Sequence, residues 1–273
     1  MTDRYAVVGN PVVHSKSPLI HAAFARQTHQ DLHYEAILAP LDGFISTVEI
    51  FRQQGGKGMN ITVPFKLQAH QLANELTERA RVAQAVNTFK FENETVLGDN
   101  TDGAGLMRDI TANLNLPVYG KRVLLMGAGG ASRGVILPLL QQQPALLAVA
   151  NRTPRKALDL QQQFATYGQI SAGGYMDFAG EQFDIVINAT AASLNDDLPE
   201  LPEGIFAARA LAYDMMYSNK LTRFLQYAAQ RGAPHLADGI GMLVEQAAES
   251  FYLWRGIRPD TRAVIAQLRN SRN

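Results

Sequence analysis

The sequence predicts an α/β protein with two domains, and three observations lead to this prediction. First, apolar strand-like runs alternate with helical patterns over roughly the first hundred residues, which is typical of a mostly parallel sheet covered by helices. Second, another alternating series begins at Arg122. Third, the stretch 115–120, which contains Pro117, interrupts the patterning and is the expected junction. A chain of 273 residues is long enough for two domains.

In the first half, short apolar runs that end near Gly, Asn or Pro predict strands. Strands are expected at residues 5–9, 33–38 and 59–63, with a hairpin of 87–92 and 95–98 around Asn93 and Glu94. A helix is expected from Ser17 to about Gln27, because Ser is a good N-cap and Pro18 suits the first helical position. Further helical patterns cover 42–53, 66–85 and 103–114.

The second half repeats the alternation more regularly. Strands are expected at 123–126, 146–150, 184–188 and 211–215. Helices are expected at 130–140, 154–164, 221–230, 241–254 and 260–269. This order predicts a second, parallel sheet.

The composition excludes several classes of function. Lys and Arg together number 25, as do Asp and Glu, so no basic excess indicates nucleic-acid binding. The chain has no Cys, which excludes disulfides and thiolate sites, and its six His are scattered, so we expect no metal site. No window of about 18 residues is apolar throughout, and the N-terminal residues lead into a short strand. We therefore expect a cytoplasmic protein without signal peptide or membrane segment.

A glycine-rich turn joins the expected strand 123–126 to the helix 130–140. Gly127 and Gly129 occupy the first two positions of the pattern G-x-G-x-x-G, and Ser132 replaces the third glycine. Such a turn allows close backbone approach to a pyrophosphate, and the helix N-terminus offers free N–H groups to it. The turn favours a dinucleotide site, with an ordinary glycine turn as the alternative.

The segment after the next strand indicates which dinucleotide binds. An NAD enzyme usually has Asp or Glu here to bind the ribose 2′-hydroxyl. This chain has Asn151 instead, followed by Arg152, Arg155 and Lys156. Arg binds a 2′-phosphate that a carboxylate would repel, so the segment favours NADP. The alternative is a solvated helix start with ordinary cations.

Several polar segments of the first half follow expected strands: 14–17, 60–66, 85–88 and 98–103. The carboxyl ends of parallel strands are where such sheets bind ligands. Their hydroxyls, amides, one Lys and one Asp suit a small, hydroxylated, anionic molecule. Taken singly, each could equally be a helix cap or a turn former.

These segments together resemble a known family. N-P-V-V-H-S-K-S-P, N-I-T-V-P-F-K, A-V-N-T, G-D-N-T-D-G, G-A-G-G-A-S-R, N-R-T, Y-D-M-M-Y and D-G-I-G-M-L-V-E-Q-A-A occur in this order from residue 10 to 248. They are similar to the shikimate/quinate dehydrogenase family. The resemblance implies reversible, NADPH-dependent reduction of 3-dehydroshikimate to shikimate in chorismate and aromatic amino acid biosynthesis.

The resemblance also implies a division of the chain and a set of roles in substrate binding. Residues 1–102 plus 240–273 would form the substrate-binding and catalytic domain, to which the last helices return, and 103–239 a Rossmann-like NADP domain. Lys66 and Asp102 would form the catalytic pair, in which Lys66 gives a proton to the ketone oxygen as hydride arrives. Contacts with the carboxylate or hydroxyls of the substrate would come from Ser15, Ser17, Thr62, Lys66, Asn87, Asp102, Tyr217 and Gln246.

The cofactor roles implied by the resemblance fall into three groups. The pyrophosphate would bind at Gly127, Ala128, Gly129, Gly130 and Ala131. The adenosine 2′-phosphate end would bind at Asn151, Arg152, Thr153 and Arg155. Met215 and Gly239 would lie near the nicotinamide, and Glu78 in the cofactor cleft.

The chain departs from the family pattern at a few positions, and some alternatives stay open. Gln84 replaces a common Gly, Ala191-Ala192 replaces hydroxyl or glycine residues, and Arg223 replaces a common Pro. The alternatives are a quinate/shikimate dehydrogenase that uses NAD or both cofactors, a relative with another hydroxy-acid substrate, and a non-catalytic NADP-binding sensor. We expect a small-molecule substrate, no nucleic-acid or membrane partner, and a monomer or homodimer.

Overall fold

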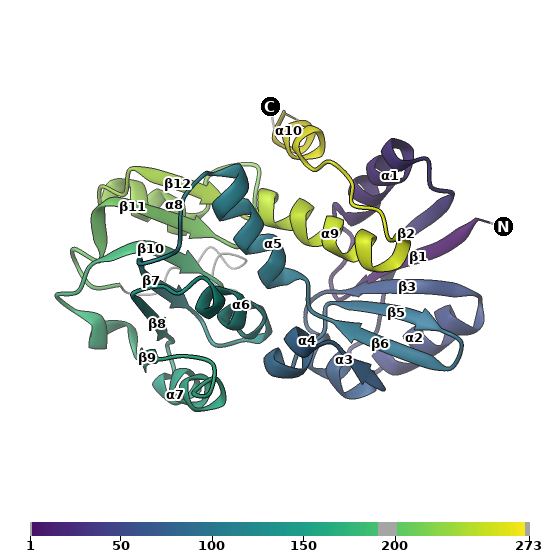
Figure 1. The fold of residues 1–273 in the computed structure, drawn as a ribbon, viewed down its shortest axis with the longest axis horizontal. Helices are drawn as coiled ribbons and strands as arrows, with labels where there is room; N and C mark the ends of the chain where they lie inside the picture. Colours follow the sequence, from purple (N-terminus) through teal and green to yellow (C-terminus); the bar gives the residue numbers. More distant parts are fainter. Residues whose placement is uncertain (1, 191–200, 271–273) are drawn as a thin grey trace. The chain divides into compact units, whose positions relative to one another are not determined.

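The computed structural model describes residues 2–190 and 201–270, and these form two compact units. The first unit comprises the chain up to Gly105 together with the segment that begins at Leu243, and the second comprises Leu106–Met242. Each unit has its own six-stranded sheet, β1–β6 in the first and β7–β12 in the second, and Figure 1 labels all of these strands except β4. The two-domain α/β prediction is confirmed.

The sheet of the first unit has the strand order β2-β1-β3-β5-β6-β4. Its strands are β1 (Asp3–Gly9), β2 (Leu32–Leu38), β3 (Gly56–Ile61), β4 (Glu75–Leu76), β5 (Thr88–Glu92) and β6 (Thr95–Asp99). The β1, β2 and β3 strands are parallel, whereas β5 is antiparallel to both β3 and β6. The expected hairpin is therefore confirmed, and Asn93 in its turn has a positive φ of 53°.

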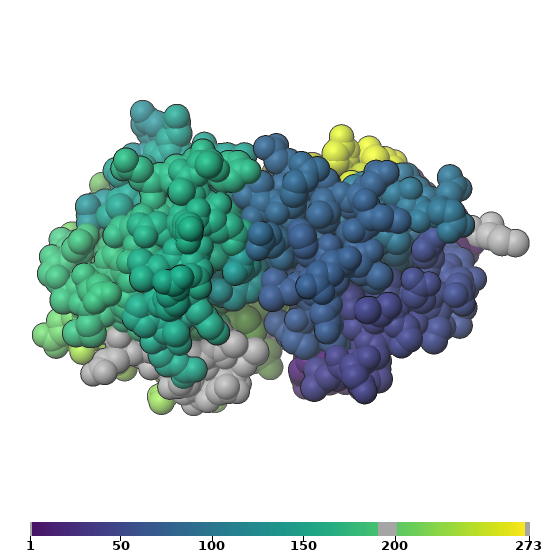
Figure 2. Space-filling model, turned by 90° about the horizontal axis from the view of Figure 1, so that it is seen from below, coloured from purple at the N-terminus to yellow at the C-terminus, as the bar shows by residue number. Residues whose placement is uncertain are grey.

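The helices of the first unit flank this sheet. They are α1 (Ser17–Thr28), α2 (Phe44–Gln53), α3 (Lys66–Leu72), α4 (Glu78–Ala83), the start of α5 (Asp102–Arg108), most of α9 (Ile240–Arg255) and α10 (Arg262–Asn270). Arg255 of α9 donates to the Gln30 side chain, and Gln27 donates to the carbonyl of Asp260. Figure 2 accordingly shows yellow atoms of the C-terminal segment in the first unit.

The prediction of one helix over 66–85 is wrong, because two short helices flank a strand there. Ala73 is extended, with φ −65° and ψ 131°. Asn74 exchanges hydrogen bonds with Val96 through its backbone N–H and its side-chain oxygen, and the short β4 then pairs with β6. Thr77 caps α4 by accepting from the N–H of Ala80. Pairing with the neighbouring strand and a new N-cap outweigh the helical pattern.

The sheet of the second unit is wholly parallel, in the order β12-β11-β10-β7-β8-β9. Its strands are β7 (Arg122–Met126), β8 (Leu146–Ala150), β9 (Ile170–Gly173), β10 (Phe183–Asn188), β11 (Phe206–Asp214) and β12 (His235–Asp238). Its helices include α6 (Gly130–Gln141), α7 (Pro154–Gln163) and α8 (Arg223–Gln230). This is the doubly wound order of dinucleotide-binding sheets, with its switch point between β7 and β10.

The sequence analysis missed or misplaced a few details. It did not anticipate β9 and β12, which are only four residues long each. The helix expected to end at 114 changes after Arg108 into a π-helical turn over Asp109–Asn113. Ser17 was the expected N-cap of the first helix, but the N-cap of α1 is Lys16, and Ser17 is the first residue of the helix. In the described part of the chain, no helix is long and apolar enough to cross a membrane.

Candidate active site

An ion pair between Lys66 and Asp102 forms the centre of the polar cluster in the first unit. Lys66 is the first residue of α3 and Asp102 the first residue of α5. The Lys66 ammonium donates to Asp102 Oδ2, and their side chains are 16% and 7% exposed. A pair this well screened from water interacts more strongly than a surface pair. Enough of Lys66 remains exposed to meet a ligand.

Asn87 holds the second oxygen of the Asp102 carboxylate. Its Nδ2 donates to Asp102 Oδ1 at 2.8 Å, and its Oδ1 accepts from the backbone N–H of Thr101 at 2.9 Å. Because a backbone N–H can only donate, that bond fixes which end of the amide faces Asp102. Asn87 also lies close to Lys66 along the backbone, since Val86 donates to the Lys66 carbonyl at 2.9 Å.

Gln246 reaches the same cluster from α9. Its Oε1 accepts from Asn87 Nδ2 at 3.3 Å and from Thr101 Oγ1 at 3.4 Å, and its Nε2 donates to the Leu243 carbonyl. The structure therefore brings together Lys66, Asp102, Asn87 and Gln246. Thr101 was not among the expected site residues, although it stands in the N-T-D-G segment beside Asp102.

The two serines lie after β1, at the carboxyl edge of the sheet. Ser15 Oγ accepts from the Ser17 N–H at 3.3 Å, as a helix-start hydroxyl does. Ser17 is buried. Burial also raises the pKa of the Tyr34 phenol well above its ordinary value, and the Ser17 side chain opposes that shift.

Thr62 follows β3, which pairs with β1, so it lies at the same sheet edge. Its methyl group occupies the space where a Cβ at Gly9 would lie, so the close approach requires glycine at position 9. The Thr62 carbonyl accepts from the Phe65 N–H at 3.1 Å, which turns the chain into α3 and Lys66. Ser15, Ser17, Thr62 and Lys66 thus all belong to the carboxyl edge of the parallel strands.

The glycine turn of the second unit has the shape that a pyrophosphate site needs. Gly127 has φ +107° and donates to the Ala150 carbonyl at 2.7 Å. A Cβ at Gly129 would meet no atom within 4 Å, so the space above the turn is open. Gly129 caps α6 without a side-chain hydrogen bond to the first turn. The residues Gly127, Ala128, Gly129, Gly130 and Ala131 therefore fit an anionic ligand at a helix N-terminus.

Ser132 takes the structural place of the third glycine. It is fully buried, and a Cβ at Gly127 would lie 3.1 Å from its Oγ. Its hydroxyl has no hydrogen-bond partner among the described residues. A larger residue would push the helix away from the glycine turn, so Ser132 keeps the close packing that glycine usually provides.

The segment 151–155, called the arginine turn, follows β8. It lies next to the glycine turn because β7 and β8 are paired neighbours. Asn151 donates its side chain to the Thr153 carbonyl at 2.9 Å, which stabilises the turn before α7. Arg152 and Thr153 are exposed. Burial raises the pKa of Tyr175 to about 12, and the charge of Arg152 opposes this. Arg155 pairs with Asp159 one helical turn later, at 2.9 Å, so its charge is partly offset.

The remaining expected cofactor residues are spread over both units. Met215 follows β11 and Gly239 follows β12, both in the second unit, where the expected substrate contact Tyr217 also follows β11. A Cβ at Gly239 would overlap the Met215 carbonyl, so this glycine has a packing reason of its own. Glu78 is exposed at the start of α4 in the first unit. Ala191 and Ala192 lie outside the described residues.

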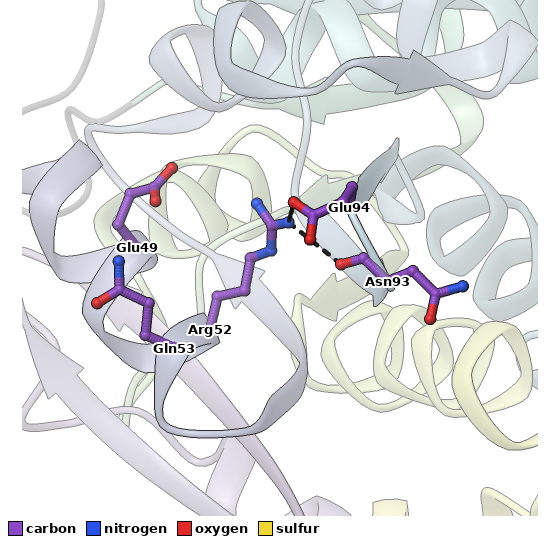
Figure 3. A pocket seen from close by; sticks show the side chains of 5 residues that line it. All are labelled: Glu49, Arg52, Gln53, Asn93 and Glu94. Carbon is purple, nitrogen blue, oxygen red and sulfur yellow. Dashed lines mark hydrogen bonds and ion pairs between the residues drawn. The ribbon is translucent and has the colours of Figure 1, made fainter.

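A surface hollow of about 330 Å³ lies elsewhere, between α2 and the β5–β6 turn. Figure 3 shows its lining residues: Glu49, Arg52, Gln53, Asn93 and Glu94. Arg52 already donates to Glu94 at 3.0 Å and to the Asn93 carbonyl at 3.1 Å. None of the expected site residues lines this hollow. Among the described residues, no group of three His, Asp or Glu could hold a metal ion.

Comparison with known proteins decides the family. Residues 7–89 match the shikimate dehydrogenase substrate binding domain, 110–196 the shikimate/quinate 5-dehydrogenase domain and 239–269 the shikimate 5′-dehydrogenase C-terminal domain. The shikimate dehydrogenase (NADP(+)) of Nitrosospira multiformis is 66% identical over 271 residues, which is 99% of this chain and 98% of that protein. The chain belongs to the shikimate dehydrogenase family.

Solved structures agree with this shikimate dehydrogenase family membership. An Ael1 enzyme from Pseudomonas putida is 52% identical, with a TM-score of 0.91 and 98% of both chains covered. Shikimate 5-dehydrogenase from Thermus thermophilus, solved with NADP(H) and shikimate, is 30% identical, with a TM-score of 0.88 and all of both chains covered.

Two departures from the shikimate dehydrogenase pattern have local structural explanations. Gln84 ends α4 in the left-handed conformation, with φ 52° and ψ 33°, which is the conformation that favours Gly at a helix end. Arg223 is the first residue of α8, behind the Thr222 cap, where Pro is favoured but not required.

Replacing Arg152 with aspartate is expected to weaken NADP(H) far more than NAD(H). A carboxylate repels the 2′-phosphate and accepts from a ribose hydroxyl, so KM for NADP should rise about 10-fold or more while KM for NAD changes little. Steady-state kinetics with both cofactors measures this. The Arg209→Asp variant, which changes an exposed Arg of β11, is the control for charge. Equal losses for NADP and NAD would contradict the assignment.

Proposed function

We propose that this protein catalyses the reversible, NADPH-dependent reduction of 3-dehydroshikimate to shikimate, a step of chorismate and aromatic amino acid biosynthesis. The observation that carries the proposal is the Lys66–Asp102 ion pair, held by Asn87 at the carboxyl edge of the first sheet. The names of close relatives support the same reaction and the same cofactor. The enzyme is thus an NADP-dependent oxidoreductase that acts on a CH–OH group.

Lys66 supplies the proton in this reaction. Reduction of a ketone places negative charge on its oxygen, and a group within hydrogen-bond distance must neutralise that charge. The Lys66 ammonium can donate three hydrogen bonds, of which one goes to Asp102. No other acceptor for its remaining N–H groups lies among the described residues, so these groups can meet the substrate oxygen and give it a proton. In the reverse direction, the neutral amine accepts the proton from the C3 hydroxyl.

Asp102 and Asn87 position Lys66 and the ring hydroxyls. A carboxylate accepts about four hydrogen bonds, and Asp102 uses one lone pair for Lys66 and one for Asn87. The others remain for substrate hydroxyls. Ser15 and Ser17 offer hydroxyl donors at the same sheet edge, which suits the substrate carboxylate. Thr62, Tyr217 and Gln246 are the further proposed substrate contacts.

The residues of the second unit fit NADP. Its pyrophosphate would bind the open glycine turn from Gly127 to Ala131, and its 2′-phosphate the turn of Asn151, Arg152, Thr153 and Arg155. When bound, the cofactor supplies the hydride. Met215 and Gly239 of the second unit and Glu78 of the first unit are the further proposed cofactor contacts.

These sites assign substrate binding and cofactor binding to different parts of the chain. Residues 1–102 with 240–273 bind substrate and hold the catalytic pair, and 103–239 bind NADP. The partners are the substrate and cofactor alone, with the chain acting as a monomer or homodimer. Light scattering of the purified protein measures the oligomeric state.

Product identification tests the proposed function. Incubation of the protein with 3-dehydroshikimate and NADPH should consume NADPH and yield shikimate, identified by proton NMR. Binding of NADPH without any shikimate formed would overturn the proposal and favour a non-catalytic NADP-binding sensor. Formation of another product from another hydroxy acid would favour a relative with a different substrate.

A further inference from the structure

The Thr88 hydroxyl lies directly behind the proposed active site, yet the reaction assigns it no role. Thr88 begins β5 and is fully buried. It pairs with Asn60 on β3 and with Asp99 on β6, so it lies in the interior of the sheet. A buried hydroxyl is costly unless it is hydrogen-bonded, so its partners indicate why a threonine stands here.

The hydrogen bonds around Thr88 have a defined direction. Asn60 Nδ2, which can only donate, points at Thr88 Oγ1 at 3.0 Å. Thr88 therefore acts as an acceptor on that side, and its single proton goes to Asn87 Oδ1 at 2.9 Å. The amide of Asn60 is held in turn by the Tyr34 phenol, which donates to Asn60 Oδ1 at 2.8 Å.

Ser250 of α9 completes this arrangement from the other side. Its hydroxyl lies 2.8 Å from Thr88 Oγ1 and accepts from Asn60 Nδ2 at 3.0 Å. Its single proton has two acceptors, Thr88 Oγ1 and the carbonyl of Gln246 at 3.1 Å, and with the Thr88 proton on Asn87 it goes to Thr88. The Thr88 hydroxyl thus contacts Asn87, the amide that holds Asp102, and the Ser250 hydroxyl contacts Thr88 and the backbone of Gln246.

We propose that Thr88, supported by Asn60 and Ser250, is a positioning residue that keeps the Asn87 amide with its N–H groups toward Asp102. Thr88 Oγ1 and the backbone N–H of Thr101 both donate to Asn87 Oδ1, so together they turn Asn87 Nδ2 toward the carboxylate. If the amide turned over, its oxygen would face the Asp102 carboxylate, and Lys66 would lose the orientation of its partner. The expected change in kcat rests on the proposed function, whereas the orientation of the Asn87 amide does not depend on it.

The Thr88→Val variant tests this inference because it removes the hydroxyl and keeps the shape and strand preference of the side chain. We expect kcat for shikimate oxidation to fall about 10-fold, which corresponds to the loss of about one buried hydrogen bond. NADPH binding should be unchanged. The Thr261→Val variant is the matched control, since Thr261 is also buried and donates to Glu245 of α9 at 2.7 Å, away from Asn87.

The Thr88→Ser variant separates positioning from general stability. It keeps the hydroxyl but removes a buried methyl, so it should lower stability through packing and still restore most of kcat. A Ser variant as slow as the Val variant, or a Val variant with wild-type kcat, would overturn the inference.

NMR of the Asn87 side-chain amide gives a readout that does not need turnover. Its N–H protons should exchange slowly in wild-type protein and in Thr88→Ser, and much faster in Thr88→Val. Equal exchange in all three would overturn the positioning role. If wild-type protein shows slow exchange but no shikimate turnover, only the proposed function fails.

Discussion

Replacing Lys66 with alanine is expected to lower kcat about 100-fold or more, within the usual range for loss of a general acid–base. The variant lacks the proton donor for the ketone oxygen and leaves Asp102, which is only 7% exposed, without its cation. NADPH binding should persist, because the glycine and arginine turns belong to the other unit. Steady-state kinetics and NADPH fluorescence measure the two effects.

Two further variants make the Lys66 test specific. Lys66→Arg retains a cation for Asp102 but cannot release its proton at neutral pH, so kcat should stay low. Lys90→Ala removes another Lys of the first unit, paired with Glu92 at 2.6 Å, and should leave kcat unchanged. Near-wild-type turnover in Lys66→Ala would remove Lys66 from the mechanism, and in Lys66→Arg would reduce its role to charge.

The first unit is expected to lose stability in mild acid because of His21. This residue of α1 is fully buried, stacks on Tyr34 at a centroid distance of 4.2 Å and lies 5.3 Å from Trp254. Neither ring nitrogen has a hydrogen-bond partner among the described residues by geometry, although the nearby Asn60 side chain favours the charged form slightly. Burial lowers the pKa of His21 from 6.5 to about 3.

The sign of the pH effect follows from this lowered pKa. Well above pH 6.5, His21 is neutral in both the folded and the unfolded protein, so it does not change the free energy of unfolding. Below pH 6.5, the unfolded chain binds a proton that the folded chain excludes down to about pH 3, so the free energy of unfolding falls. Between pH 7 and pH 5 this group alone should remove about 2 kcal/mol.

Urea unfolding at a series of pH values measures this contribution. Trp254 is the chain's single tryptophan and belongs to the first unit, so its fluorescence reports on that unit. The His21→Phe variant should flatten the pH dependence by about 2 kcal/mol between pH 7 and pH 5, whatever its stability at pH 7. His29→Asn, at the exposed end of the same helix, should not. Identical slopes for wild type and His21→Phe would refute the assignment.

Periodicity placed the longer strands of both sheets and missed the short ones. The strands β7, β8, β10 and β11 contain continuous apolar runs, such as 123–126, that sequence alone places, whereas β9 and β12 are four residues each. In the first unit, β4 is two residues long and exists because Asn74 meets Val96, which lies far along the chain. A local sequence pattern holds no information about such a long-range contact, so the prediction of one helix over 66–85 was wrong.

The candidate site could be anticipated by residue type but not by geometry. The motifs named Lys66, Asp102 and Asn87, and the structure adds how the carboxylate is shared between the other two. The sequence analysis missed the buried hydroxyls of Thr88 and Ser250. A Thr in a strand is expected for its β-propensity alone, and a Ser in a helix such as α9 attracts no notice. Only the folded sheet brings these residues, which are distant in sequence, together.

The most direct test of the account is a comparison of kcat/KM for shikimate and quinate, each with NADP and with NAD, followed by the near-ultraviolet absorbance of the reduced cofactor. Shikimate with NADP should give the highest value of the four pairs, because Ser15, Ser17, Lys66 and Asp102 suit shikimate and the arginine turn suits NADP. Absorbance that stays constant with every pair, or a higher kcat/KM with NAD than with NADP, would contradict it.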